Sequence, residues 1–190
     1  MSSKPTFSLQ AGGFLVSEPY LQDPQFFRSV LVLVEHNEQG TIGFVVNKPL
    51  PEVLLSELID VPEGMELTVF LGGPVQQDTI FFLHNLGLGL IPKSIEVSSD
   101  LWWSSDFNRL FELIEQGFAE KSQVKVLLGY SGWNVGQLRD ECENESWVVA
   151  HVPTPFVFDP DVDQLWKKVL KSLGGNFSEL TRYPIDPNLN

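Results

Sequence analysis

Short runs of hydrophobic residues, separated by turn-forming residues, dominate the first half of the chain. Runs of this length are typical of buried β-strands, and we expect strands at residues 14–16, 30–34 and 42–46. Residues 35–40 lie between the last two and contain an asparagine and a glycine, which favour tight turns. The pattern therefore predicts an antiparallel hairpin over residues 30–46.

Two further hydrophobic runs, residues 67–71 and 79–84, predict a second hairpin. The residues between them, 72–78, begin with Gly-Gly-Pro, a sequence unfavourable inside a strand, so we expect a loop there. Before this hairpin, Pro51 can occupy the first position of a short amphipathic helix that runs through residues 53–58.

Hydrophobic residues recur at helical spacing in the second half of the chain. Phe107, Leu110, Phe111 and Ile114 lie three or four residues apart and Gly117 follows them, which predicts a helix ended by glycine. Further patterns predict strands at 94–97, 124–128 and 147–150, and helices at 136–143 and 162–173.

The order of these elements predicts one α+β domain. Strands cluster in hairpins early and alternate with helices later, which favours a mixed, mostly antiparallel sheet flanked by helices over a doubly wound parallel sheet. The 190 residues suit a single domain, and no linker or repeat divides them. We therefore expect one domain over residues 1–190, with its core at about 8–173 and an irregular tail at 174–190.

The formal net charge of −13 comes from 25 acidic and 12 basic side chains and is spread over both halves of the chain. Such an excess repels phosphate backbones and anionic lipids at long range, so direct DNA binding is not expected. The acidic stretch at residues 140–145 is either a solvated helix face or a surface that docks a basic partner.

The compartment is predicted from three features. Cys142 is the one cysteine, the first thirty residues contain no secretory signal pattern, and no apolar run approaches the length of a membrane span. We therefore expect a cytoplasmic protein that does not enter the membrane.

Residues 129–133 (Gly-Tyr-Ser-Gly-Trp) follow a predicted strand and precede a predicted helix, which is the context of a nucleophile elbow. Asp140 and His151 follow Ser131 in the order of one type of catalytic triad, although Trp133 stands where the elbow requires a small residue. A hydrolase with a cleft around Ser131 is therefore one alternative, and a glycine-rich turn with Trp133 in the core is the other.

No metal ion or cofactor is predicted. His36, His84 and His151 are far apart, so we expect hydrogen-bonded histidines at strand ends, with a ligand cluster assembled in space as the alternative. Neither glycine-rich nucleotide-binding motif is complete. Cys142 lies between two glutamates, whose negative charge raises the pKa of a thiol and makes it a poor nucleophile.

Aromatic and basic residues are the remaining candidates for nucleic-acid binding. The five tryptophans would suit base stacking only beside a basic groove, and the tight basic cluster Lys167, Lys168 and Lys171 is expected to be the solvated face of one helix. The tryptophans are Trp102, Trp103, Trp133, Trp147 and Trp166.

Several motifs occur in a specific order: Gly12-Gly13-Phe14-Leu15-Val16, Asp23-Pro24-x-Phe26-x-Arg28-Ser29-Val30, Glu35-His36-Asn37 with Gly40 and Gly43, Asn47-Lys48-Pro49, Gly72-Gly73-Pro74-Val75, and residues 128–133 followed by Gly136-Gln137-Leu138. This series closely resembles the bacterial YqgE/AlgH family. The resemblance implies a cytoplasmic α+β protein. Members are commonly labelled transcriptional regulators because of one regulatory association with alginate production, and no catalytic residues are established for the family as a whole.

From these observations we expect a non-enzymatic protein with a regulatory or interaction role, acting on transcription indirectly through a protein or small-molecule partner. A hydrolase centred on Ser131 and a direct nucleic-acid binder are the alternatives. The binding surface is expected among polar residues at strand ends and turns. These residues are His36, Asn47, Tyr130, Ser131 and Gln137.

Overall fold

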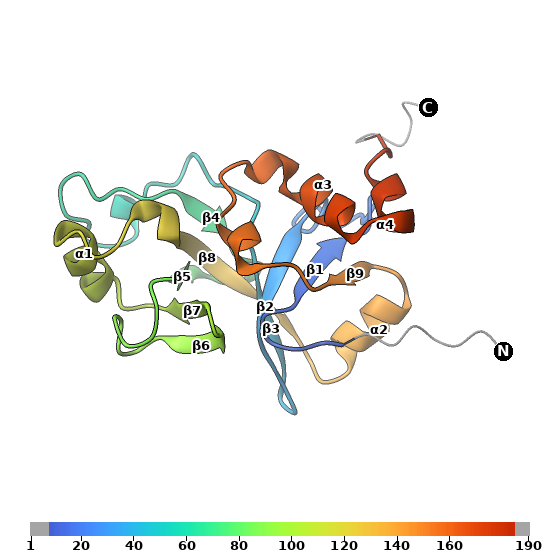
Figure 1. Cartoon of the computed structure of the whole chain (residues 1–190), viewed down its shortest axis with the longest axis horizontal. Coiled ribbons are helices and arrows are strands. Elements are labelled where there is room, and N and C mark those ends of the chain that lie inside the picture. The colour runs from blue at the N-terminus through green and yellow to red at the C-terminus, as the bar shows by residue number, and fades with distance from the viewer. Residues whose placement is uncertain (1–7, 185–190) are drawn as a thin grey trace.

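The computed structural model describes residues 8–184, in which nine strands form one sheet (Figure 1). The strands are β1 (Phe14–Ser17), β2 (Val30–Asn37), β3 (Gly40–Val45), β4 (Val69–Leu71), β5 (Val75–His84), β6 (Ile95–Ser98), β7 (Leu101–Ser104), β8 (Val124–Trp133) and β9 (Trp147–Ala150). The α-helices are α1 (Phe107–Glu115), α2 (Gln137–Glu143), α3 (Val162–Leu173) and α4 (Gly175–Leu180), and the 3-10 helices are η1 (Leu55–Glu57), η2 (Lys121–Gln123) and η3 (Thr154–Phe158).

The strand order is β6-β7-β5-β8-β3-β2-β1-β9, and β4 also pairs with β8. Neighbouring strands are antiparallel except β4 and β8, which are parallel. This confirms the α+β class and the mixed, mostly antiparallel sheet. The hairpin predicted over residues 30–46 is also confirmed, since β2 and β3 pair with each other.

The second predicted hairpin is wrong. β4 and β5 do not pair with each other, because both pair with β8 and the register places them on opposite sides of it. β5 also starts at Val75, inside the predicted loop, and its pairing with β8 is irregular between Val75 and Ile80. The hydrophobic runs identified the strands, but their partner lies about fifty residues further along the chain.

The connection between β4 and β5 crosses β8 through contacts that only glycine permits. A Cβ atom on Gly72 would lie 2.2 Å from the carbonyl oxygen of Gly129, and one on Gly73 would lie 2.3 Å from the Tyr130 carbonyl group. Gly129 itself has φ 70°, in the left-handed region that favours glycine. The two glycine-containing motifs are therefore the two sides of one backbone crossing.

Three hydrophobic clusters form the core, and each lies beneath a different helix. α3 covers one face of the β2-β1-β9 half of the sheet, with the Trp166 ring buried in the same cluster as Phe14. α2 covers the opposite face through Leu138, and α1 packs on the other half of the sheet through Phe111. Figure 1 shows α1 and α3 over different ends of the sheet.

Two predicted segments differ from the structure. The helix expected at 53–58 is reduced to η1, because Leu54 and Leu58 are exposed and only Leu55 is buried. The tail expected to be irregular contains α4, which follows α3 directly after Gly174. The rest of that predicted tail, residues 185–190, lies outside the described residues. No helix within residues 8–184 is both long enough and apolar enough to cross a membrane.

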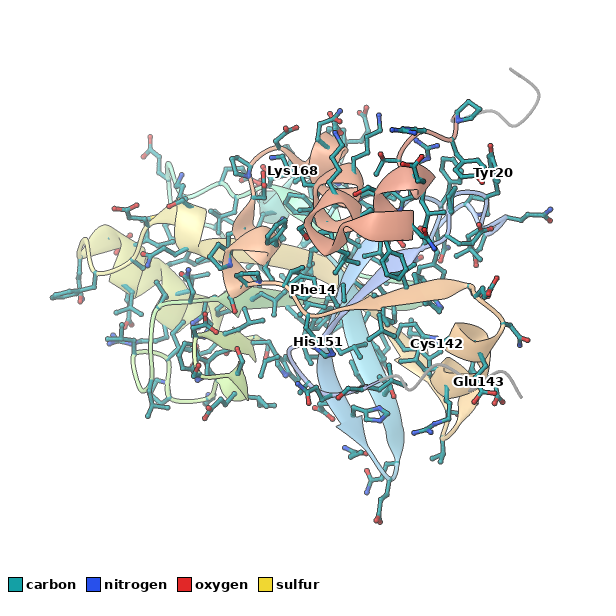
Figure 2. All side chains as sticks on the ribbon, turned by 45° about the vertical axis from the view of Figure 1, so that its right-hand side comes forward. Phe14, Tyr20, Cys142, Glu143, His151 and Lys168 are labelled. Atoms are coloured by element: carbon teal, nitrogen blue, oxygen red, sulfur yellow. The ribbon has the colours of Figure 1, made fainter. Side chains whose placement is uncertain are left out.

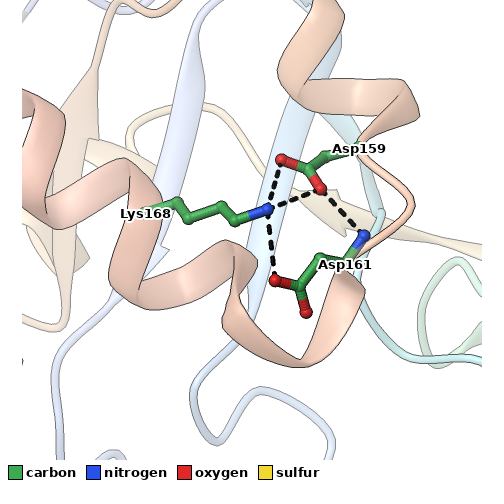
Figure 3. A network of polar contacts seen from close by, with 3 residues as sticks. All are labelled: Asp159, Asp161 and Lys168. Atoms are coloured by element: carbon green, nitrogen blue, oxygen red, sulfur yellow. Dashed lines mark hydrogen bonds and ion pairs between the residues drawn. The ribbon is translucent and has the colours of Figure 1, made fainter.

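Lys168 is not simply solvated, as the sequence pattern suggested, but holds the start of its own helix (Figure 3). Its Nζ lies 2.8 Å from Asp159 Oδ1 and 3.3 Å from Asp161 Oδ2. Burial alone would raise the pKa of the Asp159 carboxyl group, but the hydrogen bonds from Lys168 and from the Asp161 backbone lower it overall.

The buried His84 side chain is expected to make stability depend on pH. Burial lowers its pKa to about 4 from the ordinary value of 6.5, because the charged imidazolium loses its hydration. The unfolded chain then takes up the proton first, so the free energy of unfolding falls by about 3 kcal/mol as pH falls from 6.5 to 4, with no effect above that window. Urea denaturation at a series of pH values measures this slope.

The His84→Gln variant is expected to lose that part of the slope, whatever its stability at neutral pH. The matched control is His151→Gln, because His151 is exposed. An unchanged pH slope in His84→Gln would contradict the assignment.

Candidate functional site

A surface pocket of about 490 Å³ lies where three of the sequence motifs meet. Asp23 and Phe26 enter it from the β1–β2 loop, Pro74 from the crossing between β4 and β5, and Ser131 from β8. The remaining wall comes from α2 and the start of β9. Its other lining residues are Leu21, Gly132, Trp133, Gln137, Glu141, Ser146 and Trp147.

The Glu141 carboxylate organises the aromatic wall of this pocket. Its Oε2 accepts hydrogen bonds from the indole nitrogens of Trp133 at 2.9 Å and Trp147 at 2.8 Å, and its Oε1 accepts one from Gln137 at 3.0 Å. The two indole rings meet edge to face at 84°, with their centroids 6.2 Å apart. One carboxylate thus holds both indole rings in place, and its two hydrogen bonds offset the cost of removing the two indole N–H groups from water.

A larger pocket of about 810 Å³ adjoins the first and shares Leu21, Ser146 and Trp147 with it. Phe177 and Leu180 of α4 form one wall, and the carboxylates of Glu18 and Glu145 line it as well. We call the two pockets together the acidic groove. Its described lining residues include five carboxylates and no Lys, Arg or His. The carboxylates belong to Glu18, Asp23, Glu141, Glu143 and Glu145.

Two of the five predicted site residues lie in the acidic groove. Ser131 is only 1% exposed, and its Oγ donates to the Gly72 carbonyl oxygen at 3.3 Å. Gln137 is exposed at the start of α2, where its Oε1 accepts from the Asn134 backbone N–H at 3.0 Å. The two therefore share a pocket, although both also stabilise local structure.

The other three predicted residues lie elsewhere. Tyr130 and His36 line two smaller pockets, of about 320 and 240 Å³, that share residues of the β2–β3 hairpin. Asn47 is buried, and its side chain accepts from the Val30 N–H at 2.8 Å and donates to the Arg28 carbonyl oxygen at 3.0 Å. The five residues do not meet in one pocket.

The nucleophile-elbow interpretation is wrong for a structural reason. Residues 129–133 lie inside β8, where residues 131–133 pair with β3, and not in a sharp turn between strand and helix. The hydroxyl group of Ser131 points to the backbone of Gly72, and His151 is exposed on the segment after β9.

The other candidate nucleophile and base are shielded. Burial, and then the Glu141 charge, raises the pKa of the Cys142 thiol to about 11, so burial exceeds the acidic neighbours that the sequence suggested as the cause. His84 is fully buried and its Nε2 lies 2.7 Å from Ser94 Oγ. Within residues 8–184, no group of three or more His, Cys, Asp and Glu side chains is arranged to hold a metal ion.

The tryptophans do not form an open stacking platform. Trp102, Trp133, Trp147 and Trp166 are buried, and Trp166 donates its indole N–H to the Ser17 carbonyl oxygen at 2.9 Å. Their buried rings pack in the interior, and those of Trp133 and Trp147 meet edge to face in the pocket wall, so the four rings do not form the row of exposed faces on which single-strand binders stack bases.

Sequence reasoning missed Glu141 and Trp147 as site residues. Glu141 belongs to an acidic run, and although Trp133 and Trp147 lie only eight and six residues from it, no sequence pattern indicates that one carboxylate accepts from both indoles. Asp23 and Phe26 could have been identified as site residues from the sequence, because both belong to the motif that begins Asp23-Pro24.

The family model described as AlgH-like matches residues 14–178 of the chain. A protein of Cytophaga hutchinsonii described as "UPF0301 protein" is 40% identical over 182 residues, covering 96% of this chain and all of that protein. A protein of Parabacteroides distasonis with the same description is 40% identical over 179 residues, covering 94% of this chain and 90% of its own length.

Two solved structures are similar over nearly the whole chain. The solution structure of the AlgH protein from Pseudomonas aeruginosa superposes with a TM-score of 0.71 at 30% identity, covering 96% of this chain and 98% of that one. The crystal structure of a Corynebacterium diphtheriae protein gives a TM-score of 0.76 at 22% identity, covering 94% and 95%. The second similarity shows the fold alone.

Replacing Glu141 tests its place in the aromatic wall. We expect Glu141→Ala to lower the free energy of unfolding by about 2–4 kcal/mol, because two largely buried indole N–H groups lose their acceptor. Urea denaturation followed by tryptophan fluorescence measures the loss. The matched control is Asp140→Ala, which removes an exposed carboxylate from the same helix. Equal, small effects in both variants would contradict this role.

Proposed function

The chain belongs to the AlgH-like family, and from this premise we propose that it is a cytoplasmic regulatory protein that acts by binding a positively charged protein partner in the acidic groove, without catalysing a reaction. One observation carries the proposal. Three motif segments that are distant in sequence line a single pocket, and the acidic groove to which it belongs carries the exposed carboxylates of Asp23 and Glu145, with no Lys, Arg or His among its described lining residues.

Electrostatics favours a cationic partner. Glu145 and Asp23 are exposed and Glu18 is half-buried, so their charges act on an approaching molecule within the screening length of about 8 Å. The overall charge of −13 adds a long-range field of the same sign. Such fields raise association rates and reject acidic competitors.

Apolar surface in the groove favours a protein over a small ion. Phe177 is 41% exposed and faces the same pocket as Trp147 and Leu180. A pocket with an aromatic floor and a charged rim resembles the centre of a protein interface, where a few anchors supply most of the binding free energy. A peptide with alternating apolar and basic side chains satisfies both parts.

Action without catalysis is supported by the state of the candidate nucleophiles. Ser131 donates its hydrogen bond to a backbone carbonyl oxygen, and the Cys142 thiol has its pKa raised to about 11. Neither group is activated, since a nucleophile of these types requires an adjacent base or a lowered pKa. An effect on transcription would then pass through the partner, because direct contact with DNA is opposed by the net charge of −13.

The first step is to capture the partner by cross-linking in cells and to identify it by mass spectrometry. Its affinity for charge-removing variants of the acidic groove then measures how much the groove's carboxylates contribute to binding. We expect cross-links to fall on the acidic groove. The double variant Glu18→Gln/Glu145→Gln should raise the dissociation constant about tenfold at low salt, because two attractive charges are lost. Isothermal titration calorimetry gives this ratio.

The matched control is Glu38→Gln/Glu63→Gln, which removes the same charge from exposed positions outside the groove. Equal weakening by both double variants would mean that only the net charge matters. A small cationic molecule as the sole bound species would also contradict a protein partner.

The isolated protein is expected to bind duplex DNA no better than a typical acidic globular protein. Its 12 basic residues are too few and too dispersed to release many counterions from phosphates. A titration against fluorescent duplexes, including promoter fragments from the native host, tests this. Submicromolar affinity that weakens steeply with salt would instead favour direct regulation of transcription.

A further inference from the structure

β9 is the last strand of the sheet on the side of the acidic groove. Among the described residues it pairs with β1 alone, and Figure 2 shows its ribbon running between the α3–α4 pair and α2, which bears the labelled Cys142 and Glu143. Edge strands present backbone groups that can pair with another chain, so the direction of these groups decides what the edge can bind.

The hydrogen-bond register settles that direction. The Glu18 N–H donates to the Ser146 carbonyl oxygen at 3.1 Å, so this pair is a hydrogen-bonded one. Antiparallel pairs alternate, and the next hydrogen-bonded pair is therefore Val16 with Val148. The β1–β2 pairing agrees, because the Ser17 N–H bonds to Ser29 at 3.1 Å on the opposite side of β1.

Consequently Val148 and Ala150 turn their backbone groups toward β1, whereas Trp147 and Val149 turn theirs outward. Two N–H groups and two carbonyl groups thus form a ladder along the outer edge of β9 that pairs with no strand among residues 8–184. The larger pocket of the acidic groove lies against this edge, because its wall includes three consecutive residues, Trp147, Val148 and Val149.

Side chains from both faces of the sheet line that pocket. Val148 belongs to the cluster beneath α3, whereas Val149 belongs to the cluster beneath α2. The pocket also includes Phe177 of α4 on one side and Cys142 of α2 on the other. It therefore wraps around the edge and offers room for alternate side chains of an added strand on both faces.

We propose that the outer edge of β9 binds an extended, basic segment of the partner protein as an additional strand of the sheet. This proposal rests on the proposed function and specifies how the partner is held. Backbone pairing with Trp147 and Val149 supplies the register, and apolar side chains of the segment pack against Phe177 and Leu180.

The carboxylates of Glu18 and Glu145 indicate where basic side chains of the added segment bind, and the net charge of the chain disfavours a second copy of it as the occupant. Glu145 directly precedes Ser146, and Glu18 bonds to Ser146, so both glutamates flank the residue just before β9. Lys or Arg side chains of the added strand reach them there. A symmetric β9–β9 pairing would instead bring together two chains that each carry a charge of −13.

The probe is an array of peptides of about eight residues, a length typical of strands, with Lys or Arg alternating with Val, Ile, Leu or Phe. Control peptides carry Glu in place of the basic residues. We expect selective binding of basic members, and the strongest is then titrated in solution. If no basic member binds above its acidic control, the proposal is overturned.

Hydrogen exchange followed by NMR measures the protection of the individual backbone amides of β9. In the free protein, the Trp147 and Val149 amides should exchange faster than those of Val148 and Ala150, which already bond to β1. With the peptide bound, exchange at Trp147 and Val149 should slow by about tenfold or more. Unchanged exchange at both amides, with peptide bound, overturns strand addition.

Variants separate this proposal from the proposed function. Val149→Pro removes one outward N–H and no charge, whereas Val149→Ala keeps the N–H, so only the first should weaken peptide binding by about tenfold. Peptides N-methylated at alternate residues on one edge repeat the test without altering the protein. They should bind weakly, and those methylated on the opposite edge should bind normally.

The outcomes are distinct. If Glu18→Gln/Glu145→Gln weakens binding but proline and N-methylation do not, the acidic groove binds its partner in another way and only strand addition fails. If neither change weakens binding, both proposals fail. Dimerisation of the free protein that Val149→Pro abolishes would show that a second copy of the chain occupies the edge.

Discussion

The close contact between two backbone segments at Gly72, Gly73 and Gly129 is the constraint on which the rest of the structure depends. β8 pairs with β4 and β3 along one side and with β5 along the other, so the chain must cross it between β4 and β5. Side chains at the crossing would overlap carbonyl groups, with Cβ distances of 2.2–2.7 Å. The glycines therefore determine whether one strand can join both halves of the sheet.

That crossing also positions the candidate site. Pro74 follows it at the rim of the acidic groove, and Ser131, which bonds to Gly72, lies at the adjacent wall. Trp133 is the last residue of β8, before the chain enters α2. The Glu141 carboxylate on α2 accepts hydrogen bonds from the indoles of Trp133 and of Trp147, which begins β9. Strand pairing, aromatic packing and the groove are thus consecutive parts of one backbone path, which explains why residues of separate sequence motifs line the same groove.

The sequence was sufficient for elements whose pattern is local. The α3 helix from Val162 to Leu173 and the β2–β3 hairpin follow from helical spacing and turn chemistry. Pairing of β4 and β5 with β8 could not be predicted, because hydrophobic runs do not specify distant partners. The pocket that holds Ser131 and Gln137 depends on such distant contacts, because Asp23 and Pro74 enter it from other parts of the chain. Glu141 and Trp147 were missed for another reason: they are six residues apart, but no sequence pattern specifies a carboxylate that accepts from two indoles. The Asn47 side chain binds the backbone of Val30 and Arg28.

The acidic groove carries charges of two kinds, and their costs differ. Glu141 is half-buried, and its desolvation is offset by the two indole donors and by Gln137, so its carboxylate is committed to the fold. Glu145 is exposed and has φ 61°, a left-handed backbone conformation that a glycine would adopt with less strain. No structural bond in the described residues requires a carboxylate at that position. A glutamate there contributes charge at the start of the β9 edge at some expense of stability, which is the balance expected where a side chain serves binding more than folding.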